Sequence, residues 1–98
     1  MTDLDYLKEH ILDELDDAVD YMTKATEHKT DWMGKYFFNI AEQETVHANT
    51  LATMFNKVEK PADVSEAEHN KMYHAIMEKY SDTMAKYEQL KRFFCNRT

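Results

Sequence analysis

The fold is decided by residues 33–58, MGKYFFNIAEQETVHANTLATMFNKV, where one series of residues recurs at alternating spacings of four and three. The series is Met33, Phe37, Ile40, Glu44, His47, Leu51, Met54 and Val58. This spacing is typical of a helix that packs against a neighbour along its whole length. The sequence therefore predicts a helix over about residues 31–57, with a seam that is apolar except for Glu44 and His47.

Two further helices are predicted on either side of this stretch. The seam of the first, over about residues 3–27, is Leu4, Leu7, Ile11, Glu14, Ala18, Tyr21 and Ala25. The seam of the third, over about residues 65–94, is His69, Tyr73, Ile76, Tyr80, Thr83, Tyr87, Leu90 and Phe94. A short polar break at 28–30 separates the first two helices and predicts a tight antiparallel hairpin. Ser65 followed by Glu68 forms a capping box that starts the third.

The composition supports an all-α domain. The 98 residues include one Gly and one Pro, too few for the turns of an all-β or α/β domain. A chain of this length forms one domain, so we assign residues 1–98 to a single helical unit. Apolar residues make up 43% of the chain, enough for a core. Helices this long leave wide apolar flanks uncovered in so small a chain, which favours self-association.

The charge and the segment pattern exclude several function classes. The formal net charge of -7 argues against nucleic acid, because phosphate binding depends on clustered Lys and Arg. No apolar run approaches the roughly 18 residues of a membrane span, and the first residues lack the features of a secretion signal. The single Cys95 offers no internal disulfide. We therefore expect a cytoplasmic protein whose partner is a cation.

The hairpin register brings the polar seam residues together. If the hairpin turns about Lys29, position n on the first helix faces position 58 minus n on the second, and Glu14 lies opposite Glu44. His47 is one turn along the same face. Burying two facing carboxylates without a cation is costly, so a bound metal is expected. Oxygen-rich ligands with one nitrogen suit iron or manganese better than structural zinc.

This ligand set is half of a known one. Ferritin-like di-iron bundles take a Glu from each of two helices and Glu-x-x-His from each of two others. The third helix contains Glu66-Ala67-Glu68-His69, but its capping box already explains these acids. We therefore expect the other half from a second chain, since Glu14, Glu44 and His47 taken twice are four carboxylates and two imidazoles. The expected architecture is a helical hairpin plus a third long helix, completed to a ferritin-like four-helix bundle by dimerisation.

A family resemblance becomes visible in the same residues. The stretch DELDDAVDY (13–21), followed by Glu44-x-x-His47 within AEQETVHANTL (41–51), resembles the encapsulated ferritins. These are short, three-helix members of the ferritin-like superfamily, and the resemblance covers about residues 10–58. It implies oxidation of Fe(II) at a di-iron ferroxidase centre assembled between two subunits, within a larger ring.

The resemblance also implies roles for individual residues. Glu14, Glu44 and His47 would be the iron ligands, and Tyr21 would match a tyrosine beside the metals. Asp13 and Asp16 would match acids on the route by which iron reaches the site. An encapsulin shell, a protein nanocompartment, would be a partner. The family is usually loaded through a targeting peptide after a Gly/Ser-rich linker, and this sequence ends in KRFFCNRT without one.

Alternative functions remain open at this point. The favoured prediction is a ferroxidase for iron storage or detoxification, with Fe(II) and dioxygen or peroxide as reactants. The same ligands would serve a di-iron scavenger of peroxide or dioxygen. A different class is a helical interaction or assembly protein without catalysis, in which Glu14, Glu44 and His47 form a polar layer that sets the register of the packed helices.

Overall fold

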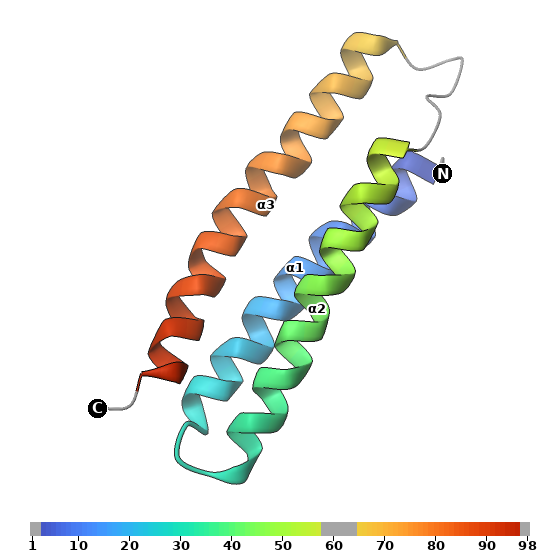
Figure 1. Ribbon diagram of the computed structural model, residues 1–98. Helices are drawn as coiled ribbons and strands as arrows, with labels where there is room; N and C mark the ends of the chain where they lie inside the picture. The colour runs from blue at the N-terminus through green and yellow to red at the C-terminus, as the bar shows by residue number, and fades with distance from the viewer. Residues whose placement is uncertain (1–2, 58–64, 97–98) are drawn as a thin grey trace.

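The computed structural model describes residues 3–57 and 65–96, and these form three α-helices and no strand (Figure 1). The helices are α1 (Asp3–Glu27), α2 (Trp32–Lys57) and α3 (Glu66–Cys95). Their bounds lie within one residue of the expected ranges. Val58, the last residue of the predicted seam, falls outside the described residues. The predicted all-α class is confirmed.

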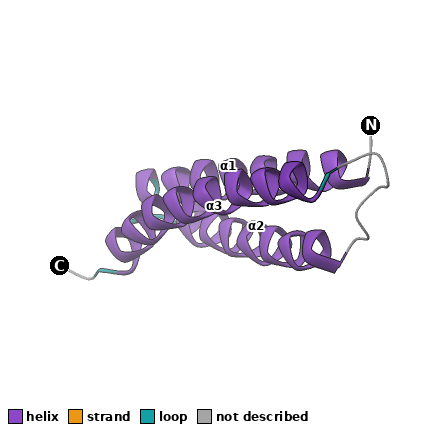
Figure 2. Cartoon of the chain, turned by 90° about the horizontal axis from the view of Figure 1, so that it is seen from above, coloured by secondary structure: helices purple, strands orange, loops and turns teal. Residues whose placement is uncertain are grey.

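The three helices lie side by side in a rod 53 Å long and about 18 Å wide. α1 and α2 form an antiparallel hairpin, and α3 runs in the same direction as α1 (Figures 1 and 2). α1 is the central partner, because its backbone approaches both other helices, whereas no Cα of α2 lies within 8 Å of a Cα of α3 among the described residues.

Local sequence explains the start of each later helix. The backbone N–H of Met33 donates to Asp31 Oδ1 at 2.8 Å, so Asp31 caps α2. The N–H of Glu68 donates to Ser65 Oγ at 3.1 Å, which confirms Ser65 as the cap of α3. The hairpin turn requires Gly34, since a Cβ there would lie 2.3 Å from the carbonyl oxygen of His28.

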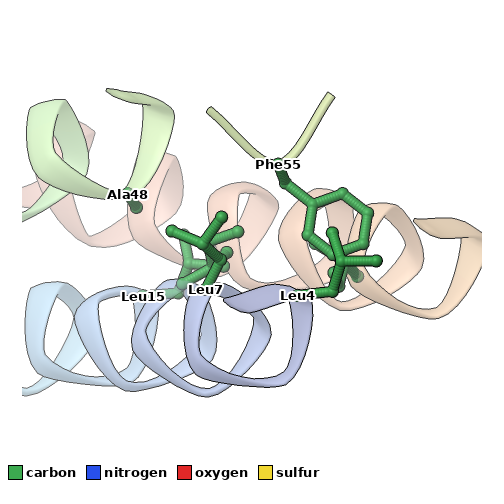
Figure 3. Packing of buried hydrophobic residues seen from close by; sticks show 7 residues of the cluster. Leu4, Leu7, Leu15, Ala48 and Phe55 are labelled. Atoms are coloured by element: carbon green, nitrogen blue, oxygen red, sulfur yellow. The ribbon is translucent and has the colours of Figure 1, made fainter. Parts of the chain in front are cut away.

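The core consists of two layers that follow one another along the rod, one in each half. One layer holds Leu4, Leu7, Ile11, Leu15, Ala48, Phe55 and Ile76. The other holds Ala18, Met22, Ala25, Ala41 and Tyr87. Figure 3 shows the first layer from close by, with Phe55 of α2 pointing toward Leu4 of α1. The predicted α1 seam is buried at its aliphatic positions, whereas Tyr21 is only half-buried. Leu15 and Met22, outside that seam, are also buried.

The predicted seam of α2 is corrected by the structure. The buried residues of α2 are Gly34, Ala41, Ala48 and Phe55, a line with a seven-residue spacing that runs beside the predicted one. Small side chains at this line let α1 approach closely, which rotates the larger residues to the flanks. Leu51 is consequently half-buried and Met54 is 47% exposed. The rotation leaves Glu44 and His47 at the edge of the α1–α2 interface, within reach of solvent.

Within the described residues, no helix combines the length and apolar character needed to cross a membrane.

Candidate metal centre

Glu14, Glu44 and His47 form a cluster halfway along the hairpin, as the register predicts. One ligand atom from each of the three residues lies within 4.8 Å of the others. Glu14 comes from α1, and Glu44 and His47 come from successive turns of α2. The spacing of three residues on α2 places the carboxylate and the imidazole on neighbouring turns of one face.

The two carboxyl groups of this cluster oppose each other electrostatically. A hydrogen bond to Glu14 and burial raise the pKa of Glu44 to about 7, and the negative charges of Glu14 and Asp17 add to the effect. The proton of that hydrogen bond holds the two acids together in the absence of a cation. A divalent cation would replace this proton and neutralise both groups.

The donor set fits a metal of the iron type. Glu14 Oε2 is buried and has no hydrogen-bond partner among the described residues, and it lies 3.8 Å from His47 Nδ1. A carboxylate oxygen left without a partner at this depth is costly unless something binds it. The His47 side chain is 59% exposed, so the cluster opens to the outside of the hairpin. Two oxygen donors and one nitrogen donor match the ligand preference of iron or manganese.

The cluster borders an open hollow of about 270 Å³ between α1 and α2. Its lining residues are Tyr6, His10, Glu14, His47, Thr50 and Leu51. His10 stacks on Tyr6, with ring centroids 4.2 Å apart. The hollow gives small molecules a way to the ligand atoms of Glu14 and His47.

Tyr21 lies two turns along α1 from Glu14. Its ring stacks with Phe37 at a centroid distance of 6.4 Å, and it packs against the second core layer. The described structure therefore places Tyr21 among aromatic residues on the same side of α1 as Glu14, outside the three-residue cluster.

The acids expected on the iron route lie in different places. Asp13 is exposed, and its charge contributes to the raised pKa of Asp17. Asp16 pairs with Lys79 of α3 at 3.5 Å and lines an open groove of about 540 Å³ between α1 and α3. Positions 14 and 16 are about 200° apart around the helix, so Asp16 lies on the flank of α1 away from Glu44.

Sequence reasoning did not single out Asp17 for the site. Burial raises the pKa of Asp17 first, and the negative charge of Glu14 raises it further. Asp17 in turn raises the pKa of Glu44, which places it in the electrostatic field of the cluster. The signal was present in the sequence, because residues three apart are neighbours on a helix and Asp17 follows Glu14 by three.

The alternative ligands on α3 do not join the cluster. Glu66 and Glu68 are exposed in the first turn, where Ser65 caps the helix. His69 stacks on Phe55 with ring centroids 5.5 Å apart, at the far end of the core from Glu44.

Fold and cluster together are those of an all-α domain with two carboxylates and one imidazole that could hold a metal ion. The sequence model of the rubrerythrin family matches residues 5–95, nearly the whole chain, and the chain belongs to this family. Domains of the family are ferritin-like and bind a di-iron centre, with oxidoreductase-type roles. The comparisons with curated proteins and with solved structures each gave no significant match.

Proposed function

We propose that this protein is a ferroxidase of the encapsulated-ferritin kind, which oxidises Fe(II) at a di-iron centre shared by two copies of the chain. The observation that carries the proposal is the meeting of two carboxylates and one imidazole within 4.8 Å of one another in the middle of the α1–α2 hairpin. The membership in a di-iron family supports iron as the metal.

The need for two copies follows from the ligand count. Among residues 3–57 and 65–96, no fourth His, Cys, Asp or Glu joins the group of Glu14, Glu44 and His47. Three donors are half of the set that a ferritin-like di-iron centre uses. A second copy that presents the same three residues would complete it.

The outward face of α2 supports pairing through this helix. Trp32 and Tyr36 are 72% and 64% exposed, and Met54 is also exposed. Positions 32, 36, 47 and 54 fall within one face of the helix, where exposed polar residues also lie between the aromatic residues and Met54. An exposed face that combines aromatic residues with His47 is suited to an interface that also closes a metal site.

The proposed chemistry is a two-electron oxidation. Two Fe(II) ions each give one electron, and dioxygen or peroxide takes up both. The carboxyl groups of Glu14 and Glu44 hold the iron, and Glu44 releases its proton when iron binds. His47 supplies the nitrogen ligand from the exposed side. The ferric product then leaves toward storage or mineral, and an encapsulin shell is the partner we propose for that step.

The test is Fe(II) oxidation followed by ferric absorbance. Wild type should exceed the uncatalysed rate, and Glu44→Ala and His47→Ala should each remove most of the excess, because each variant lacks one proposed ligand. Glu78→Ala and His74→Ala make the same chemical changes at exposed positions of α3 and should leave the rate unchanged. If both ligand variants oxidise iron like wild type, the ligands are misassigned and the assembly role is favoured.

A further inference from the structure

The helix that carries Glu44 and His47 is held on two flanks in different ways. On one flank its small buried residues pack directly against α1. On the other flank the α2 and α3 backbones are farther apart, with no Cα pair within 8 Å among the described residues. Long side chains therefore make the connection between α2 and α3.

Glu42 is the centre of the polar part of this connection. The Tyr87 hydroxyl donates to Glu42 Oε2 at 2.5 Å, and Lys91 Nζ donates to Glu42 Oε1 at 2.6 Å. Tyr87 is 1% exposed, whereas about one third of the Glu42 and Lys91 side chains is exposed, so the bonds lie at the edge of the core. Both oxygens of one carboxylate are thus held by residues one turn apart on α3. We call this group of Glu42, Tyr87 and Lys91 the Glu42 clasp.

The clasp is linked to the metal cluster by helix geometry. Glu42 and Glu44 leave α2 about 200° apart, because each residue turns the helix by about 100°. A rotation of α2 that moves Glu44 away from Glu14 must therefore move Glu42 relative to Tyr87 and Lys91. Hydrogen bonds to a charged group are shorter and roughly twice as strong as neutral ones, so the clasp resists this rotation.

We propose that Tyr87 and Lys91 are positioning residues for the metal site, which act through Glu42 by fixing the rotation of α2. The helix face whose orientation they fix carries Glu44 and His47. The inference therefore rests on the proposed ferroxidase for its functional role. The positioning itself exists in the metal-free chain and can be measured there.

The first experiment measures the approach of α1 and α2 without metal. In the full chain carrying Glu14→Cys, Glu44→Cys and Cys95→Ser, dibromobimane links two close thiols and becomes fluorescent, and denaturing gels separate links within a chain from links between chains. Adding Tyr87→Phe should lower the rate of the intrachain link several-fold. Tyr80→Phe makes the same change one heptad earlier, away from Glu42, and should leave the rate unaltered.

Lys91→Gln is the second variant, because Lys91 is only half-buried and its loss threatens folding less than a change in the core. It should lower the rate in the same direction as Tyr87→Phe. Rates equal to the parent chain in both variants would overturn the inference, and the clasp would then only fasten α3. An equal loss with Tyr80→Phe would also overturn it, since the effect would be general loosening.

The second experiment measures metal binding in the chain with its native ligands, using Co(II) alone and its visible absorption. Tyr87→Phe should weaken Co(II) binding by about tenfold, as for other residues that orient metal ligands, and Tyr80→Phe should not. If Tyr87→Phe keeps wild-type affinity, positioning of the site is refuted. If wild type itself binds no Co(II), the proposed ferroxidase fails, while the cross-linking result still decides whether the clasp sets the rotation.

Discussion

Glu42 and Glu44 stand two residues apart on α2 and have opposite environments. Glu42 receives hydrogen bonds from Tyr87 and Lys91, which outweigh the effect of burial and hold its pKa below the ordinary value. Glu44 faces the carboxyl group of Glu14, and its pKa is raised to about 7. The neighbours of Glu42 stabilise its charged form in the folded chain, whereas the neighbours of Glu44 destabilise its charged form.

The difference is the one expected between an acid with a structural role and an acid at a functional site. A carboxylate that is fully partnered by the protein has no need for a ligand, whereas two carboxyls forced together leave a place for a cation. Perturbed acids of the second kind gather at functional sites. Adding a cation, or substituting either glutamate, should remove the difference between the environments of Glu42 and Glu44.

The largest expected effect is metal-dependent association. Fe(II) that binds only the paired state stabilises it by several kcal/mol when its concentration exceeds the dissociation constant a thousandfold. Wild type should therefore shift toward a dimer or ring on adding Fe(II) at about one metal per chain, the ratio of a shared two-iron site. Glu14→Ala should blunt the shift at unchanged helicity. Light scattering coupled to size exclusion measures it, and a monomer saturated with metal would contradict the two-chain site.

Much of this fold follows from the sequence. The three helices, their order and the cap at Ser65 are readable because each depends on local patterns of spacing and turn residues. The rotation of α2 is not readable in this way. Both the predicted seam and the observed line of Gly34, Ala41, Ala48 and Phe55 have helical spacing, and only the close approach of α1 selects the smaller side chains.

The site was predictable to a similar depth. The register alone brought Glu14 to Glu44 and His47, because a tight hairpin turn leaves little freedom for sliding. Asp16 was placed on the iron route by resemblance, and its pairing with Lys79 depends on where α3 packs. The Glu42 clasp likewise joins residues 45 or more positions apart, which no local spacing relates. Whether each residue acts as assigned remains a prediction.

A second, smaller effect is expected when a larger side chain is placed in the α1–α2 interface near the two glutamates. Ala41 is fully buried beside Glu42, and Ala41→Leu inserts three heavy atoms into a packed layer. We expect a loss of about 1–3 kcal/mol in the free energy of unfolding. Denaturant unfolding measures it, with Ala85→Leu at an exposed position of α3 as the matched control. Equal stability of the two variants would show that α1 and α2 are less closely packed here.

The pH dependence of stability should distinguish the two glutamates by sign. The folded chain holds the Glu44 proton up to about pH 7, whereas the unfolded chain releases it near pH 4.5, so this contribution to stability falls as pH rises through that window. Glu44→Gln should therefore gain thermal stability over wild type more at pH 8 than at pH 5, without metal. Glu42→Gln should lose stability about equally at pH 5 and pH 8, and the loss should shrink only as pH falls below about 4.5, because a lowered pKa stabilises the folded state above the unfolded value. The same gain from Glu44→Gln at both pH values would contradict a shared proton.

The smallest effect is expected at Tyr21, on the Glu14 flank of α1 but two turns from the cluster. Its ring stacks with Phe37, and Tyr21→Phe keeps that ring and removes only the hydroxyl. Any influence on iron must therefore come through the hydroxyl, which the fold does not require for packing. We expect a change of a few-fold at most in Fe(II) oxidation kinetics, with helicity and metal stoichiometry unchanged. Stopped-flow oxidation measures it, with Tyr80→Phe, a half-buried tyrosine on α3 away from the cluster, as the control. If the Tyr21→Phe variant has the same oxidation kinetics as wild type, Tyr21 serves only in packing and has no part in the chemistry.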